Sequence, residues 1–139
     1  NDGFMDVLVL RGAWFGSEGH HPKSLLRNNG DGTFTEVTEK AGVGGAGHYG
    51  QGVAVGDFDN DGYPDLYVTG YGSAILYHNN GDGTFTETSK TAGVEDASGY
   101  YGLGVTWSDV NGDGRNDLVL HFDVQASRIP CGATSASWP

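Results

Sequence analysis

The sequence predicts an all-β protein made of four-stranded antiparallel β-propeller blades, and three observations lead to this prediction. First, residues 25–43 (LLRNNGDGTFTEVTEKAGV) recur at 76–94 with 13 of 19 residues identical, and residues 47–68 recur in more varied form at 99–120. Second, the repeats hold short runs of alternating, β-branched and aromatic residues between turns rich in Gly, Asn and Asp. Third, no segment keeps a helical periodicity. Four short strands in about 50 residues are typical of one propeller blade.

The complete repeat, residues 47–98, is expected to form one whole blade. Its four strands are predicted at Gly52–Phe58, Asp65–Gly70, Ala74–Asn79 and Thr84–Ser89. The segment NNGDGTF before the last strand predicts a tight hairpin, because Asn, Gly and Asp adopt the positive φ angles that such a connection needs. One loose helical turn is the most that we expect at Glu36–Ala41 and at Thr88–Ala92.

The flanking repeats are incomplete by the same alignment. Residues 1–46 are expected to supply the last three strands of a first blade, and residues 99–123 the first two of a third, which makes a partial propeller of about two and a half blades. The first strand of the third blade is predicted at Leu103–Val110. A closed propeller needs ~4–8 blades, so we expect either the remainder of a longer propeller or self-association of copies. Residues 124–139 match no blade and are interpreted as a C-terminal tail.

The composition argues against several classes of function. The formal net charge is −11 and the seven basic residues form no cluster, which argues against a nucleic acid partner. No apolar run approaches the ~20 residues of a membrane-spanning helix, so no membrane span is predicted. Cys131 is the only cysteine, which excludes an intrachain disulfide and a cysteine-based zinc site. Asp supplies 13 of the 18 acidic residues, and this excess favours turns and metal-binding loops over helices.

The second repeat contains the segment DFDNDGYPD, which starts at Asp57 and carries carboxylates at its positions one, three, five and nine. Gly62 at position six allows a sharp turn, and Tyr63 at position seven can offer its backbone carbonyl. Calcium takes about six to eight oxygen ligands at ~2.3–2.6 Å, so the segment predicts a Ca²⁺ site. The predicted ligands are Asp57, Asp59, Asp61, Tyr63 (carbonyl) and Asp65, then Asp109, Asn111, Asp113, Arg115 (carbonyl) and Asp117 in DVNGDGRND, with Asp2 and Asp6 in a partial first loop.

Electrostatics and spacing support calcium in these loops. Two carboxylates ~4 Å apart repel by roughly 4 kcal/mol at an effective dielectric constant near 20, and a divalent cation removes this repulsion. EF-hand and dockerin-type loops begin in the same way but need an acidic residue at position twelve, where this chain has Val68 or Leu120. They also need flanking helices, whereas strands are predicted here. Magnesium is disfavoured, because it prefers fewer carboxylates and retains waters.

The repeated segments resemble those of a known family. The segments DFDNDGYPDLYV, DVNGDGRNDLVL and NNGDGTF are similar to FG-GAP/VCBS repeats, as in integrin α-subunit propellers and many bacterial secreted proteins. The segment LRGAWFGSEGHHPKSLLRNNGDGTFTEVT resembles the ASPIC/UnbV-type, cartilage-acidic-protein-like branch. The resemblance covers residues 1–122 and implies a β-propeller, commonly of seven blades, with calcium bound in the first hairpin of several blades. Family members serve adhesion and ligand binding; some relatives are lectins and some sit inside enzymes.

Other residues are weaker candidates for a site. The longer link Arg11–Lys23 is a possible ligand loop, and the alternative is that its aromatic residues cover a neighbouring blade. Its candidate residues are Trp14, Phe15, His20 and His21, of which the histidine pair is a weak transition-metal candidate. We interpret His48, His78 and His121 as isolated turn or strand-surface residues. Tyr49, Tyr100, Tyr101 and Trp107 are interpreted as inter-blade packing, with a ligand-lined channel as the alternative.

The expected function is binding, without catalysis. The sequence has no G-x-S-x-G elbow, H-E-x-x-H motif or P-loop, and its carboxylates occur as metal loops and not as a pair flanking a pocket. We expect an extracellular scaffold or protein-interaction and adhesion module that is secreted or on the cell surface, with the periplasm as a further possibility. Its ligand would be a protein or a glycan outside the cell. The alternative is a carbohydrate-binding lectin, and a third hypothesis is part of a secreted enzyme.

Overall fold

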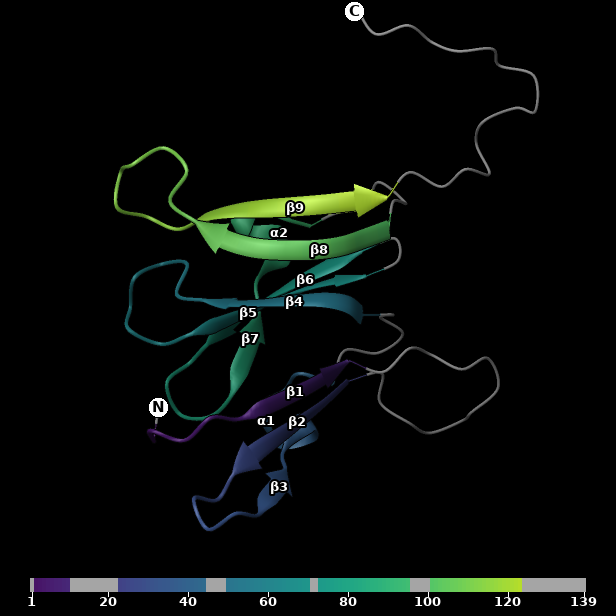
Figure 1. The fold of residues 1–139 in the computed structure, drawn as a ribbon, viewed down its shortest axis with the longest axis vertical. Helices are drawn as coiled ribbons and strands as arrows, with labels where there is room; N and C mark the ends of the chain where they lie inside the picture. Colours follow the sequence, from purple (N-terminus) through teal and green to yellow (C-terminus); the bar gives the residue numbers. More distant parts are fainter. Residues whose placement is uncertain (1, 11–22, 45–49, 71–72, 96–100, 124–139) are drawn as a thin grey trace, which may run out of the picture.

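The computed structural model describes residues 2–10, 23–44, 50–70, 73–95 and 101–123. Within them the chain forms three antiparallel sheets that follow one another in space in sequence order (Figure 1), as an all-β protein of repeated blades requires. The first sheet contains β1 (Val7–Leu10), β2 (Lys23–Asn28) and β3 (Phe34–Glu36). The second contains β4 (Gly50–Gly56), β5 (Asp65–Gly70), β6 (Ala74–Asn79) and β7 (Phe85–Glu87), and the third contains β8 (Tyr101–Ser108) and β9 (Asp117–Asp123).

The second sheet is a complete blade with the strand order β4-β5-β6-β7. The predicted bounds of β5 and β6 agree with the structure. The prediction for β4 was wrong by two residues, because the strand ends at Gly56 and the chain turns at Asp57, whose carboxylate accepts bonds from the amides of Asp61 and Gly62. The prediction for β8 was wrong in the same way: the strand ends at Ser108 and the chain turns at Asp109, whose carboxylate accepts bonds from the amides of Gly112 and Gly114. Both strands begin two residues earlier than predicted, because a register shift between Gly50 and Gly52 in β4, and between Gly102 and Gly104 in β8, lets the pairing continue.

The outer strands of the first and second blades, β3 and β7, are short, and each leads into a single helical turn. The predicted hairpins are present: the amides of Asn29 and Asn80 donate across the turn to the carbonyls of Thr33 and Thr84, both at 3.0 Å. After β3 and β7 the chain forms α1 (Thr38–Ala41) and α2 (Ser89–Ala92), where one loose turn was expected. The strand predicted at 84–89 is therefore shorter at both ends.

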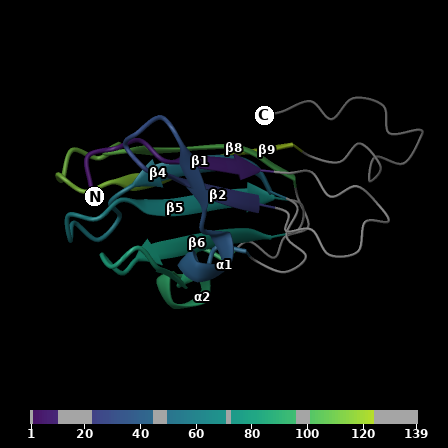
Figure 2. The ribbon, with the colours of Figure 1, turned by 90° about the horizontal axis from the view of Figure 1, so that it is seen from below.

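Buried hydroxyl groups attach these helical turns to their sheets. Thr38 Oγ1 accepts a hydrogen bond from the amide of Leu25 at 2.8 Å, and Ser89 Oγ accepts the equivalent bond from Leu76 at 2.9 Å. Thr38 and Ser89 are both buried, so these bonds satisfy strand amides that would otherwise be unpaired. Figure 2 shows α1 and α2 on the same side of the molecule, beyond β6 and away from β4 and β8.

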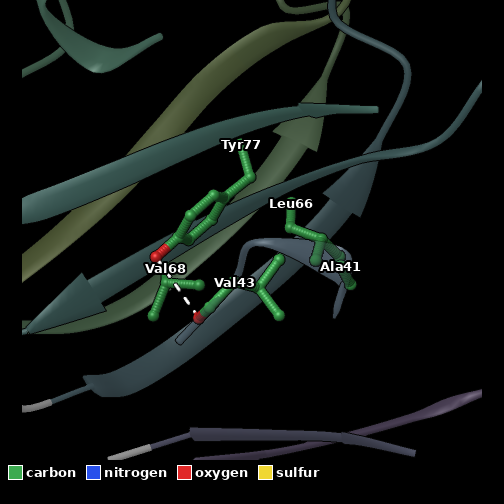
Figure 3. Packing of buried hydrophobic residues seen from close by; sticks show 5 residues of the cluster. All are labelled: Ala41, Val43, Leu66, Val68 and Tyr77. Carbon is green, nitrogen blue, oxygen red and sulfur yellow. Dashed lines mark hydrogen bonds between the residues drawn. The ribbon is translucent and has the colours of Figure 1, made fainter. Parts of the chain in front are cut away.

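The hydrophobic core lies between the blades, and β5 contributes to both of its halves because its side chains alternate between the two faces of the sheet. Towards the first blade, Leu66, Val68 and Tyr77 pack on Ala41 and Val43 (Figure 3). Towards the third blade, Tyr67, Ala74 and Leu76 form a second cluster, which packs against residues of β8 and β9. All six residues of β5 are buried, as expected for a strand covered on both faces.

The inner strands place the predicted calcium loops at one end of the molecule. β4 contacts β8 directly, and the loops that follow these strands, residues 57–64 and 109–116, extend from the same end of the sheets (Figure 1). The side-chain amide of Asn116 donates to the carbonyl of Asp57 at 3.0 Å and thereby links the two loops. In the described part of the chain, no helix has the length and apolar character needed to cross a bilayer.

Candidate metal centre

The loop of the complete blade is a tight turn that its own carboxylates stabilise. Gly62 has a φ of 91°, a conformation that favours glycine. Asp57 accepts bonds from the amides of Asp61 (3.1 Å) and Gly62 (2.9 Å), and Asp61 accepts one from the amide of Tyr63 (2.8 Å). These bonds curl the backbone around its acidic side chains, so that alternate residues point towards one centre.

The carboxylates of this loop come together as the spacing predicted. One oxygen atom from each of Asp57, Asp59 and Asp61 lies within 4.8 Å of the others. A second group within the same limit joins Asp59 and Asp65 to the imidazole of His78, so Asp59 belongs to both groups. Hard carboxylate oxygens from several residues of one loop are the donor set that calcium prefers. These groups could therefore hold a metal ion.

Asp65 anchors the loop to the sheet. Its side chain is fully buried at the start of β5, and its two oxygens accept hydrogen bonds from the amides of Phe58 (3.0 Å) and Asn79 (2.8 Å). Burial raises the pKa of the Asp65 carboxyl, while the bonds from Asn79 and Phe58 act in the opposite direction. A cation bound nearby would favour the ionised carboxylate. Asp6 keeps this role in the first blade, where it accepts a bond from the amide of Asn28 at 2.9 Å.

His78 was missed by the sequence analysis, and its interpretation as an isolated residue was wrong. Its Nδ1 atom lies 3.3 Å from an oxygen of Asp65 and 3.4 Å from an oxygen of Asp59, and Nε2 lies 3.9 Å from Asp61. Phe58 meets the imidazole edge-on, with ring centroids 6.0 Å apart. No loop motif includes His78; the signal is the pairing of β5 with β6, which sets Tyr77 opposite Leu66 and so brings the next residue beside Asp65.

The third repeat keeps the turn of the complete blade. Asp109 accepts bonds from the amides of Gly112 (2.7 Å), Asp113 (3.1 Å) and Gly114 (2.8 Å), and these bonds, chiefly that from Gly114, lower the pKa of the Asp109 carboxyl. Asp117 accepts from the amide of Val110 at 3.0 Å, as Asp65 does from Phe58.

The convergence of donors differs between the two loops. Among the residues that the structure describes, groups of three carboxylate or imidazole donors occur only in the second repeat. One reason is that the third repeat has Asn111 at position three, whose side chain bonds to Asp113. The ligand set in the third loop, with the carbonyls of Arg115 and Tyr63, stays a prediction, and so does the partial site at Asp2 and Asp6.

An aromatic ring at position seven of the loop packs on the neighbouring hairpin. An added Cβ on Gly81 would lie 2.8 Å from the ring of Tyr63, and one on Gly30 would lie 2.6 Å from the ring of Phe4. The rings therefore rest directly on these glycines of the NNGDGTF turns. This contact explains why an aromatic residue follows the acidic turn in both blades that have the hairpin, and it joins the loop to the outer half of the blade.

The remaining candidates divide between packing and segments that the structure does not describe. Trp107 packs between blades, as interpreted: its indole lies edge-on to the ring of Tyr67 at 6.3 Å, and a Cβ on Gly56 would lie only 2.4 Å from it. The proposed ligand loop, with Trp14, Phe15, His20 and His21, lies outside the described residues. So do His48, Tyr49, Tyr100 and the tail 124–139.

The chain matches the family of the FG-GAP-like repeat over residues 1–68 and again over residues 57–120. It is similar to cartilage acidic protein 1 from Mus musculus and from Homo sapiens, each 39% identical over 71 residues, and to that from Xenopus tropicalis, 38% identical over 71 residues. The alignment covers 50% of this chain and 11% of each of these relatives, so the chain spans only a small part of their length. The family match extends over most of the chain and coincides with the repeated sheets, and the chain therefore belongs to the FG-GAP-like repeat family, whose repeats form β-propeller blades.

Proposed function

We propose that the chain is a calcium-binding propeller segment that serves as an extracellular scaffold or protein-interaction and adhesion module. The observation that carries the proposal is the convergence of the three carboxylates of Asp57, Asp59 and Asp61 in the loop of the complete blade. Asp65 would hold the sheet end of the same site. Bound calcium would neutralise these carboxylates and fix the loop, which leaves the two linked loops as a rigid surface at one end of the blades.

The location follows from the affinity that such a site is expected to have. Extracellular calcium modules bind with dissociation constants of about 10⁻⁴–10⁻³ M, which matches the calcium concentration outside cells and exceeds that inside. We therefore infer a secreted or cell-surface protein that binds a protein ligand. The formal net charge of −11 is compatible with this, because calcium neutralises part of it.

The calcium site is tested by thermal unfolding of the full chain with calcium and with EDTA. A ligand that binds only the folded state stabilises it by RT ln(1 + [L]/Kd), which is about 1.4–2.7 kcal/mol at about 10 mM calcium for the affinities above. For a domain of this size we expect a rise in Tm of roughly 5–10 °C. An unfolding curve that is the same in calcium and in EDTA would contradict the proposal.

Two alanine variants separate the site from acidity in general. Asp59→Ala removes the carboxylate that belongs to both donor groups, so the calcium-dependent rise in Tm should largely disappear. Asp31→Ala is the matched control: Asp31 lies in a hairpin and accepts bonds from Thr33, so this variant should lose some stability but keep the calcium response. If both variants respond to calcium like the parent chain, the ion does not bind in the second-repeat loop.

A further inference from the structure

The imidazole of His78 is held against the acidic loop by the end of β6. Asn79, the next residue, donates its amide to Asp65 Oδ1 at 2.8 Å, and its side chain donates to the carbonyl of Pro64 at 2.9 Å. Phe58 covers one edge of the imidazole, with ring centroids 6.0 Å apart. Only 26% of the His78 side chain is exposed. These contacts fix the strand end to the loop and give the ring a defined position beside the carboxylates.

One nitrogen of this ring is buried without a hydrogen bond. Nδ1 of His78 has no hydrogen-bond partner among the described residues, although oxygens of Asp65 and Asp59 lie 3.3 Å and 3.4 Å from it. Buried polar atoms in proteins are nearly always satisfied, and a bound ion is one of the partners that such an atom takes. Nδ1 and the two carboxylate oxygens therefore form a group of donor atoms around one point.

The spacing and the chemistry of these donors match a small transition-metal ion. Zinc binds histidine nitrogen and carboxylate oxygen at about 2.0–2.2 Å, so two of its ligands in a tetrahedral arrangement lie about 3.3–3.6 Å apart. Both distances from Nδ1 fall in this range. Imidazole nitrogen suits zinc, copper and nickel, whereas calcium takes oxygen ligands. Three protein ligands with a water as the fourth ligand are a common zinc arrangement.

The repeat shows that His78 is not part of the calcium motif. The hairpins align with an offset of 51 residues, which places Arg27 of the first blade at the position of His78. The first blade keeps the anchoring bond of this region, since Asp6 accepts a hydrogen bond from the amide of Asn28 at 2.9 Å. An arginine side chain only donates hydrogen bonds and offers no lone pair to a metal. The scaffold is therefore common to both blades, but the imidazole ligand is particular to the second.

We propose that Asp59, Asp65 and His78 form a binding site for a transition-metal ion of the zinc class, which competes with calcium at the acidic loop. Competition follows because Asp59 also belongs to the group of Asp57 and Asp61, and because two dications so close together repel each other. The competition rests on the proposed calcium function, whereas the zinc site does not. Zinc would then be an antagonist of calcium at this loop.

The site is tested by isothermal titration of zinc chloride into the full chain, after treatment with EDTA and dialysis. His78→Gln removes the nitrogen ligand and should abolish one zinc equivalent or weaken it at least about tenfold. His121→Gln is the matched control, because His121 is an exposed histidine on β9 outside both donor groups, and it should leave this equivalent unchanged. Circular dichroism checks that both variants are folded. Equal zinc binding by the parent chain and His78→Gln would overturn the proposal, as would a parent chain that binds no zinc.

Nuclear magnetic resonance of the chain labelled with ¹⁵N-histidine identifies the ligand atom. Zinc should shift the Nδ1 resonance of His78 strongly and the Nε2 resonance much less, because the buried nitrogen is the one that lies between the two carboxylates. A dominant shift at Nε2, or no shift at either nitrogen, would overturn the assignment.

The competition is tested by repeating the zinc titration in about 10 mM calcium. The apparent zinc affinity of the parent chain should fall at least about tenfold for calcium dissociation constants of about 10⁻⁴–10⁻³ M. An unchanged zinc affinity in a chain whose Tm rises with calcium would overturn the competition. If calcium leaves Tm unchanged but zinc binding depends on His78, only the proposed function fails. If the calcium response is present and zinc binding does not depend on His78, only this inference fails.

Discussion

Raising the pH from 7 to 10 should stabilise the chain, and replacement of Lys23 by methionine should remove most of this gain. Lys23 lies at the start of β2 with no exposed surface, and its ammonium group donates to the hydroxyl of Tyr77 and lies 5.1 Å from the centre of that ring. Burial lowers the pKa of Lys23 from 10.5 to about 8. The folded state therefore holds this proton less tightly than the unfolded state does.

The size and sign of the effect follow from this difference. The shift of about 2.5 pKa units corresponds to at most about 3 kcal/mol of unfolding free energy. Between about pH 8 and 10.5 the unfolded chain binds more protons, so stability increases with pH across this window. Burial also raises the pKa of Tyr77 from 10.0 to about 12, so this group lowers stability as the pH rises further, from 10 to 12. The pair predicts a stability maximum near pH 10.

The assay is urea denaturation at fixed calcium concentration, at pH 7, 8, 9 and 10, with the free energy of unfolding extrapolated to water. The parent chain is compared with Lys23→Met and with Lys40→Met, which replaces an exposed lysine on α1. Because other groups also titrate, the informative quantity is the difference between variant and parent at each pH. This difference should change by up to about 3 kcal/mol for Lys23→Met and stay constant for Lys40→Met. Parallel curves for the parent and Lys23→Met would refute the reasoning.

Two further predictions concern glycines under aromatic rings, and the same denaturation assay measures both. Gly56→Ala should destabilise by about 1–3 kcal/mol, because the new Cβ would lie 2.4 Å from the indole of Trp107, while Gly104→Ala should cost little, because its Cβ would have a normal contact at 3.6 Å; equal losses would contradict this. Gly81→Ala should destabilise more than Gly83→Ala: both have a positive φ, but only Gly81 lies under the ring of the neighbouring loop, 2.8 Å from an added Cβ. A larger loss in Gly83→Ala would show that backbone strain alone decides.

The sequence predicts the order and type of the strands well, because the repeated segments show the same pattern of strand and turn residues twice. The strand ends were less predictable. β4 and β8 end two residues early, where Asp57 and Asp109 bond to backbone amides that a continuing strand would use for its own ladder. The alternation of apolar residues continues through Phe58, so periodicity alone cannot show that the turn begins before it.

The acidic loop was predictable because all its donors lie within nine residues. Asp57, Asp59 and Asp61 point to one centre as a consequence of local turn geometry, which a short motif encodes. His78 and Lys23 were not predicted as members of any site or pair, since their partners lie on another strand or in another blade. Such contacts depend on strand register and on the packing of one sheet on the next, and a local sequence motif predicts neither of these.

The two blade interfaces differ in which tyrosine donates a hydrogen bond to the backbone carbonyl at the end of the helical turn, and this difference affects which residues stabilise each interface. The carbonyls of Val43 and Val94 are equivalent, and both accept a hydrogen bond from a tyrosine hydroxyl. In the second blade the donor is Tyr67 of the same blade, but the first blade has Leu8 at that position, so the donor must come from Tyr77 of the next blade.

The hydrogen bond to the carbonyl of Val43 therefore crosses between blades. The same tyrosine hydroxyl accepts a bond from the buried ammonium group of Lys23 in the first interface. Among the residues that the structure describes, the second interface has no such crossing bond at the carbonyl of Val94, and Trp107 instead packs against the backbone at Gly56. The indole N–H of Trp107 is buried without an acceptor among the described residues, a cost that the first interface avoids by having Val55 at the equivalent position. It follows that pH should act mainly on the first interface and changes of side-chain volume mainly on the second, although the two are built from nearly the same repeated sequence.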